Sequence, residues 1–156
     1  LVRRRRLQLA RDRALPDPPS TFVGFPPPVD EEAPASGDAL RGLAACSGRV
    51  RGTARVLRSP ADASRLRSGE ILVAPYADVG WSPLFLVAGA VVTEIGGPLS
   101  HAAVVAREYG VPTVVNVSDV TRLVRTGDEV EIDGTAGTVR IVARGEHGPA
   151  AHAHAE

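Results

Sequence analysis

The stretch TEIGGPLSHAAVVAREYGVP, residues 93–112, decides what this chain can fold into. The apolar run AVVT at 90–93 leads into it and predicts a buried strand. A glycine-containing turn separates this strand from residues 100–109, which we predict to be helical because Gly110, a usual residue after a helix, follows them. A buried strand, a tight turn and a helix in this order indicate an α/β fold.

The turn between this strand and helix has the features of an anion-binding site. Gly96 and Gly97 allow a sharp bend and leave N–H groups open to an anion, because no Cβ stands in the way. The first turn of the helix adds unpaired N–H groups and the positive end of the helix dipole. Ser100 suits either an N-cap or a phosphate contact, and Thr93 either a local hydrogen bond or a phosphate contact. We therefore predict a phosphate-binding site here.

His101 stands at the first helical positions behind this predicted anion site. The positive helix terminus disfavours a charged imidazolium, so we expect a neutral, nucleophilic ring. If a ring nitrogen attacks a phosphoryl group, the same N–H donors stabilise the negative oxygens of the product. The residues alone leave open a second interpretation, in which His101 is a structural histidine beside a tight turn.

The segment GGPLSHAAVVAREYGVP resembles the phosphohistidine signature of the phosphoenolpyruvate-utilising enzymes, whose swivelling domain is shared by pyruvate phosphate dikinase, phosphoenolpyruvate synthase and rifampin phosphotransferase. The resemblance extends through SGRVRGTARVL, GEILVAPYADVGWSPLF, AVVTEIGG and GDEVEIDGTAGTVRIV, so it covers roughly residues 43–142. It implies a β/β/α swivelling domain of the α/β class that carries a phosphoryl group on His101. It also implies that the phosphorylated atom is the ring nitrogen remote from the backbone.

The resemblance also implies partner domains. In that family the swivelling domain moves between a nucleotide-binding (ATP-grasp) domain, which loads the histidine from ATP, and a second domain that binds the acceptor. We therefore expect ATP and Mg²⁺ on a partner domain and this chain to be an incomplete part of a larger phosphotransferase, or a stand-alone relic of one. The short sequence after Val142 and the stretch DVGWSPLF resemble the rifampin phosphotransferase branch, where the histidine domain comes last. A rifampin-like compound, pyruvate, and water or phosphate stay open as acceptors.

Two positions depart from the family pattern. Leu99 stands where the dikinase has a regulatory threonine, so that form of control is not expected. Asn116 stands where a glycine is common, which raises a question about the local loop geometry but not about the histidine.

Four residues are candidates for docking a partner domain. Arg107 is six residues past His101 and does not share its helical face, whereas Glu108 is nearly aligned but two turns away. We interpret both as surface or docking charges. Asp78 and Trp81, in the ADVGW segment, are candidates for the surface presented to a partner, and a core or lid aromatic is the alternative for Trp81.

Composition shifts divide the chain into segments. We predict a basic helical segment at 1–14, a Pro-rich linker at 15–35, the phosphohistidine domain at 36–143 and a disordered tail at 144–156. Near the end of the domain, strands predicted at 128–132 and 137–142 flank Asp133-Gly134, which is a hairpin signal. The predicted domain is therefore an α/β fold with a closing antiparallel hairpin.

The composition excludes several function classes. The 18 basic residues, all Arg, balance 18 acidic residues, which argues against nucleic acid or an anionic membrane as a partner. The absence of Lys excludes a Walker-type or Schiff-base lysine. A single Cys46 excludes a disulfide framework, and His147, His152 and His154 lack a fixed third ligand, so we predict no metal site. No apolar run could span a bilayer and no secretory signal opens the chain, so we expect a cytoplasmic protein without membrane contact.

Two other functions stay open at this point. The first is a non-catalytic regulatory or docking module that has kept the fold but not the phosphotransfer. The second is a scaffold whose basic N-terminus docks nucleic acid. Acid-labile, alkali-stable phosphate on His101 would exclude the first, and a salt-dependent shift of DNA or RNA would support the second.

Overall fold

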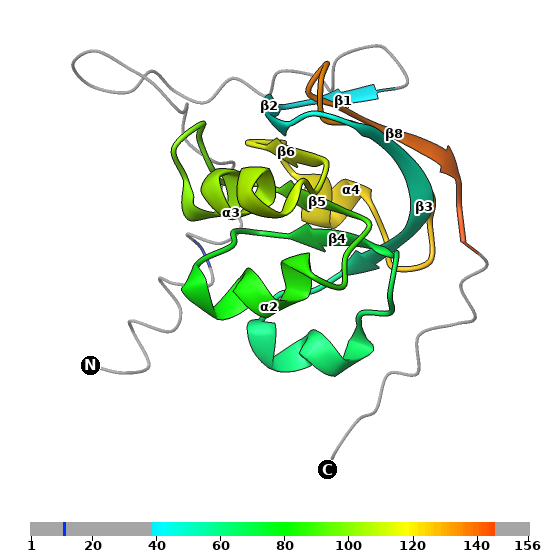
Figure 1. The fold of residues 1–156 in the computed structure, drawn as a ribbon. Helices are drawn as coiled ribbons and strands as arrows, with labels where there is room; N and C mark the ends of the chain where they lie inside the picture. Colours follow the sequence, from blue (N-terminus) through cyan, green and yellow to red (C-terminus); the bar gives the residue numbers. More distant parts are fainter. Residues whose placement is uncertain (1–10, 12–38, 146–156) are drawn as a thin grey trace. The chain divides into compact units, whose positions relative to one another are not determined.

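A single bent strand, β3 (Arg49–Val56), joins two layers of sheet. The structure is a computed structural model that describes residues 39–145 and Arg11. The first half of β3 pairs antiparallel with β7 (Glu129–Asp133), and its second half pairs parallel with β4 (Ile71–Ala74). Figure 1 shows the curve that this double role imposes on β3.

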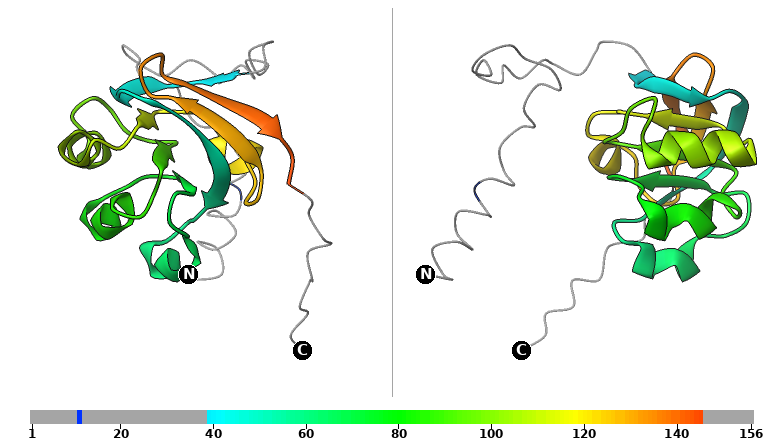
Figure 2. Two further views of the ribbon diagram at one scale, coloured as in Figure 1. Left: turned by 45° about the vertical axis from the view of Figure 1, so that its right-hand side comes forward. Right: turned by 60° about the vertical axis from the view of Figure 1, so that its left-hand side comes forward.

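Within the described residues the strand order is β1-β8-β7-β3-β4-β5-β6-β2. The remaining strands are β1 (Ala39–Arg41), β2 (Leu43–Cys46), β5 (Ala90–Thr93), β6 (Thr113–Val115) and β8 (Thr138–Ala143). β1, β8, β7 and β3 pair antiparallel, whereas β3, β4, β5 and β6 pair parallel, with β2 antiparallel at the edge. In Figure 2 (left) the antiparallel layer covers one side of the parallel layer and helices cover the other. The predicted α/β class and the closing β7–β8 hairpin are confirmed.

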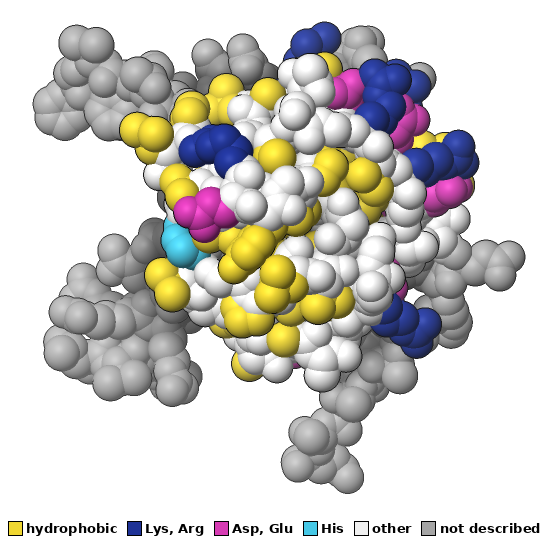
Figure 3. Space-filling model, viewed as in Figure 1, with side chains coloured by type: hydrophobic (Ala, Val, Ile, Leu, Met, Phe, Trp, Pro, Cys, Tyr) yellow, Lys and Arg dark blue, Asp and Glu magenta, His cyan; other side chains and the backbone are white. Residues whose placement is uncertain are grey.

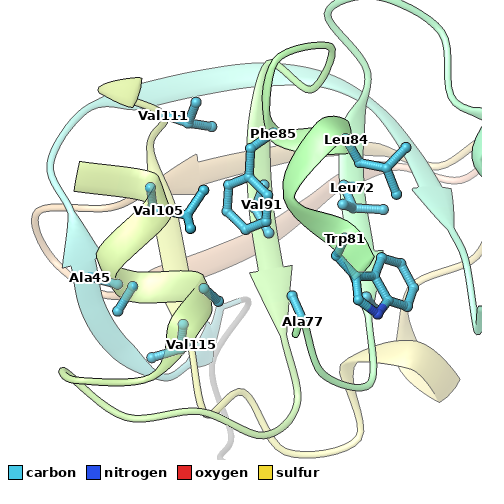
Figure 4. Packing of buried hydrophobic residues seen from close by; sticks show 14 of the residues in the cluster. Ala45, Leu72, Ala77, Trp81, Leu84, Phe85, Val91, Val105, Val111 and Val115 are labelled. Atoms are coloured by element: carbon cyan, nitrogen blue, oxygen red, sulfur yellow. The ribbon is translucent and has the colours of Figure 1, made fainter. Parts of the chain in front are cut away.

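Alternation along the parallel strands sorts their side chains into two cores. In β4, Ile71 and Val73 pack with Ile132 of β7 between the two layers. Leu72, between them in sequence, faces the other way and packs in a cluster with Phe85 and the helices. Figure 4 shows this helix-side core. The parallel strands are therefore buried on both faces, which explains their nearly continuous apolar sequences.

The helices are short, and α3 lies within the range predicted at 100–109. They are the 3-10 helices η1 (Pro60–Arg65) and η2 (Val79–Trp81) and the α-helices α2 (Ser82–Phe85), α3 (His101–Tyr109) and α4 (Val120–Leu123). Helix α3 follows β5, which lies between β4 and β6 in the parallel layer. Its N-terminus therefore lies beyond the carboxyl ends of these strands, the edge at which open α/β sheets commonly bind ligands.

Several expectations about organisation need correction. β1 and β2 were not predicted, because strands this short are specified by their distant partners β8 and β6 rather than by their own pattern. The predicted disordered tail begins too early at 144: the Arg144 guanidinium donates to an oxygen of Asp128 at 2.8 Å, and the N–H of Gly145 donates to the other at 3.0 Å. The rest of the tail, the Pro-rich linker and the basic segment, apart from Arg11, lie outside the described residues.

The β7–β8 turn is displaced by one residue from the position that the predicted strands at 128–132 and 137–142 imply. β7 ends at Asp133 and β8 begins at Thr138, so four residues connect them. One carboxylate oxygen of Asp133 accepts the N–H groups of Thr135 and Ala136, and Gly137 adopts the positive φ of 68°. The predicted hairpin is thus formed by an Asp-capped turn whose left-handed residue is Gly137.

Asp128, just before β7, is fully buried and joins its own turn to the segment at 144–145. Its carboxylate accepts the N–H of Arg125 at 2.9 Å, the N–H of Gly145 at 3.0 Å and the Arg144 guanidinium at 2.8 Å. Burial alone raises the pKa of this carboxyl, but these donors outweigh it and hold the pKa below its usual value. The ionised carboxylate therefore stabilises the fold.

We expect Asp128→Asn to lower the free energy of unfolding by about 2 kcal/mol at pH 7, because an amide NH₂ then faces backbone donors. A depressed folded-state pKa contributes stability above the unfolded pKa of about 4, and this contribution is lost as pH falls through the folded value. The difference between the two proteins should thus shrink below about pH 4, measured by urea unfolding across pH. Asp119→Asn, at an exposed pair with Arg122, is the matched control and should change stability by less than about 0.5 kcal/mol. An equal loss at all pH values would contradict the role of the charge.

Candidate functional site

The helix that carries His101 is well defined at both ends. Ser100 is its N-cap, with an extended backbone and a hydroxyl that accepts the N–H of Ala103 at 3.4 Å. Gly110 ends it in the left-handed conformation at φ 66°, as predicted. The amides of His101 and Ala102, in the first turn, have no acceptor within the helix. They form the donor set that the sequence predicted at this helix terminus.

The hydroxyls of Thr93 and Ser100 lie close to Gly96. Thr93, the last residue of β5, is fully buried, and its hydroxyl has no hydrogen-bond partner among the described residues. A Cβ placed on Gly96 would lie 3.3 Å from the hydroxyl oxygens of both Thr93 and Ser100, and 3.0 Å from Cβ of Val115. The absence of a side chain at Gly96 therefore lets the loop lie close to both hydroxyls. A Cβ on the neighbouring Gly97 would meet no atom within 4 Å.

His101 is half-buried, and its Nε2 lies 2.9 Å from the hydroxyl oxygen of Ser82. Ser82 is the first residue of α2, which packs beside α3 (Figure 1). The ring nitrogen remote from the backbone is thus the one that contacts a hydroxyl. The sequence analysis missed Ser82, because 19 residues separate it from His101 and only the packing of the two helices brings them together.

The candidate docking residues have different surroundings. Asp78 is exposed, and its carboxylate accepts the N–H of Gly80 at 3.0 Å, so it caps η2. Glu108 is exposed as well. Trp81 is fully buried and contacts Tyr76 edge-to-face with ring centroids 6.2 Å apart, so its assignment to a docking surface is wrong and the core alternative holds.

Arg107, the remaining candidate, hydrogen-bonds within the chain. Its guanidinium donates to the carbonyl of Pro98 at 3.0 Å and to that of Ala45 at 3.3 Å. Pro98 belongs to the loop between β5 and α3, so Arg107 contacts the loop that leads into His101.

Exposed hydrophobic side chains occur in the loop before α3 and in η2. Leu99 is 88% exposed, Ile95 69% and Val79 73%. Figure 3 shows the histidine at the side of the domain with hydrophobic side chains beside it. The loop between β5 and α3 is fixed at its start, where the carboxylate of Glu94 accepts both the N–H and the hydroxyl of Thr121. Its apolar residues are therefore presented from a tethered loop.

The backbone conformation of Asn116 explains why glycine is common at this position in the family pattern. It follows β6 with a φ of 59°, in the left-handed region. Glycine adopts this conformation freely, and Asn tolerates it best among other residues. The departure from the family pattern therefore leaves the loop conformation accessible.

The sequence comparison finds a family model that matches the part of the chain around His101. The sequence model described as "PEP-utilising enzyme, mobile domain" matches residues 66–137. Residues 66–137 are therefore similar to the mobile domain of PEP-utilising enzymes. The match contains β4, β5 and α3, and with them Thr93, Gly96, Ser100 and His101.

Curated relatives extend the similarity beyond these residues. An uncharacterized protein of Mycobacterium tuberculosis is 48% identical over 96% of the chain, and the prodigiosin synthesizing transferase PigC of Serratia marcescens is 43% identical over 94%. Rifampicin phosphotransferase of Streptomyces sviceus is 46% identical over 67%. The chain covers 18%, 17% and 12% of these proteins, respectively, so it spans less than a fifth of their length.

A solved structure supports the fold alone. Aconitase X from Thermococcus kodakaraensis matches with a TM-score of 0.54 and 23% identity, over 68% of this chain and 99% of that one.

In the part of the chain that the structure describes, no helix is long and apolar enough to cross a membrane.

Proposed function

We propose that this domain is the phosphoryl carrier of an ATP-dependent phosphotransferase, with His101 as the residue that is transiently phosphorylated. The observation that carries the proposal is the position of His101. Its Nε2 contacts a hydroxyl, and it starts a helix beside the fully buried Thr93 hydroxyl, which has no hydrogen-bond partner in the described part of the chain. An orphaned buried hydroxyl next to free helix amides suits an anion that arrives during function.

A hydrogen bond from Ser82 favours the tautomer of His101 in which Nε2 carries the lone pair that a nucleophile needs. When the Ser82 hydroxyl donates a hydrogen bond to Nε2, that nitrogen is the unprotonated one with the lone pair, and the ring proton sits on Nδ1. In the proposed step the Nε2 lone pair forms a bond to phosphorus, the phosphorus–oxygen bond to the nucleotide breaks, and its electron pair leaves with the nucleotide oxygen. Ser82 then turns from the nitrogen and is free to donate to a phosphoryl oxygen.

The loop and helix terminus supply donors for the charged product. The backbone N–H groups of Gly96, Gly97 and the first turn of α3, with the hydroxyls of Thr93 and Ser100, are the groups we assign to the phosphoryl oxygens. Because these donors are fixed before the transfer, they stabilise developing charge without reorganising. This positioning suits phosphoryl transfer, in which catalysis depends mainly on geometry and electrostatics.

The nucleotide and acceptor sites belong, in this proposal, to other domains. ATP and Mg²⁺ bind an ATP-grasp domain that loads His101 as a kinase would, and a second domain binds the acceptor, a rifampin-like compound or pyruvate. The relative named rifampicin phosphotransferase supports the first acceptor class, whereas PigC is named for a different product. Exposed Asp78 and Glu108, with the apolar residues around His101, are the contacts we propose for docking in a cytoplasmic enzyme.

The test is transfer from ATP. The purified chain is incubated with labelled ATP, Mg²⁺ and its nucleotide-binding partner, taken from the same polypeptide or an adjacent reading frame. We expect an acid-labile, alkali-stable label on the peptide that contains His101, identified by mass spectrometry under neutral conditions. Absence of label while the partner turns over ATP would overturn the proposal and favour a regulatory or docking module that no longer transfers phosphate.

A further inference from the structure

Arg107 joins the loop before His101 to a distant edge strand. One guanidinium nitrogen donates to the carbonyl of Pro98 at 3.0 Å, and the other to the carbonyl of Ala45, in β2, at 3.3 Å. Although Arg107 lies near the C-terminal end of α3, its long side chain reaches back along the helix, the direction that helical side chains favour. It therefore contacts the loop at the N-terminal end of the helix, next to His101.

The acceptor in β2 results from a local irregularity of the sheet. The register between β2 and β6 shifts between Ala44 and Cys46, which makes Ala45 the extra residue of a bulge. A bulge leaves its extra residue outside the regular ladder, so its carbonyl can be directed elsewhere. The side chain of Ala45 is buried in the helix-side core, which holds this bulge in place. β2 thus offers Arg107 a fixed anchor.

The charge of Arg107 also distinguishes it. Both of its acceptors are neutral carbonyls, and no carboxylate among the described residues lies within ion-pair distance of it. Arg55 and Arg144, by contrast, pair with buried or nearly buried carboxylates. Hydrogen bonds from a charged donor are stronger than neutral ones. Arg107 therefore braces the loop firmly and leaves a positive charge beside it.

We infer that Arg107 is a positioning residue for the phosphoryl transfer proposed above, on which this inference rests. The brace holds the loop at Pro98, between Gly97 and Ser100, so that the amides and hydroxyls around the phosphoryl group keep one orientation. Without the brace these donors sample several orientations, and preorganised stabilisation is lost. Arg107 itself does not contact the reacting atoms in this assignment.

The experiment uses phosphoramidate, a small phosphoryl donor that needs no partner domain. The Nε2–phosphorus bond of His101 forms as the phosphorus–nitrogen bond of phosphoramidate breaks and ammonia leaves. We expect Arg107→Ala to slow labelling of the His101 peptide about tenfold and Arg107→Lys to recover part of the rate, because an ammonium group restores a donor and the charge. Arg122→Ala, which removes the same charge from an exposed helix, is the matched control and should label at the wild-type rate.

Two further measurements separate positioning from a general loss of structure. Added ethylguanidinium should restore labelling of Arg107→Ala, and hydrogen exchange at the amides of Ser100 to Ala102 should be faster in this variant than in wild type. Wild-type labelling of Arg107→Ala, or slow labelling that ethylguanidinium does not relieve and that follows a fall in melting temperature, would overturn the inference. If the wild-type chain takes no phosphoryl group from either donor, the proposed function fails, whereas the exchange measurement still decides whether Arg107 braces the loop.

Discussion

Replacing His101 with Gln is expected to leave the domain folded and to reduce phosphoryl uptake by about 10³-fold or more. The residue is half-buried at the start of α3, and a Gln side chain at that position keeps a polar group that can reach Ser82. What it removes is a nitrogen lone pair able to form a bond to phosphorus. The measurement is labelling from ATP through the nucleotide-binding partner, with unfolding curves to show that stability is retained.

A matched control uses the other histidines of the chain. His147, His152 and His154, exchanged together for Gln, should leave labelling from ATP unchanged, since none of them belongs to the proposed site. Ser82→Ala should give an intermediate result, slower by about tenfold, because the ring remains but its Nε2 loses the hydroxyl that keeps the lone pair in place. Comparable label on the His101→Gln protein would show that another residue accepts the phosphoryl group and would exclude the proposed carrier role.

Local signals in the sequence were sufficient for the histidine and its helix. Ser100 as N-cap, Gly110 as the left-handed terminator and the strand at 90–93 were each predicted from nearby residues, and the structure confirms them. Such features depend on hydrogen bonds within one turn of the chain, so a short window contains the information. The glycine turn and its hydroxyls belong to the same window, which is why the candidate site could be outlined without coordinates.

Contacts that depend on packing could not be predicted in this way. Ser82 reaches His101 only because α2 lies beside α3, and no spacing rule connects two residues on different helices. The helical position of Arg107 correctly separates it from the face of His101, yet the length of its side chain and the bulge at Ala45 determine what it binds. Trp81 was ambiguous because an aromatic residue in a loop suits either a surface or a core. Tertiary structure decides each of these cases.

Gly134 is a further example, because the structural reason for this glycine differs from the one that the sequence suggested. An Asp-Gly pair is typical of hairpin turns in which glycine has a positive φ, but in this turn Gly137 adopts the positive φ. At Gly134 the constraint is space: a Cβ there would overlap the carbonyl oxygen of Cys46 and lie 3.1 Å from the amide nitrogen of Thr113. The N–H of Gly134 also donates to the carbonyl of Gly48 at 2.8 Å. The β7–β8 turn is therefore pressed against backbone atoms of β2 and β6.

We expect Gly134→Ala to lower the free energy of unfolding by about 3 kcal/mol or more. The new methyl group would meet backbone atoms of Cys46 and Thr113, and backbone atoms cannot move aside as the end of a flexible side chain can. Gly52→Ala is the matched control: its new Cβ would have ordinary contacts, the nearest at 3.6 Å, and should change stability by less than about 1 kcal/mol. Urea unfolding of the three proteins measures both values.

Gly134→Ala should affect the loop before His101 as well as the stability of the domain. The turn at Gly134 rests on Cys46, the neighbour of the bulged Ala45 that anchors Arg107, so displacing the turn displaces that anchor. Gly134→Ala should therefore also speed hydrogen exchange at the amides of Ser100 to Ala102 under conditions in which the domain is still folded. A loss of stability within about 1 kcal/mol would instead mean that β2 yields easily at Cys46, and a strand that yields there could not serve as the anchor of the loop.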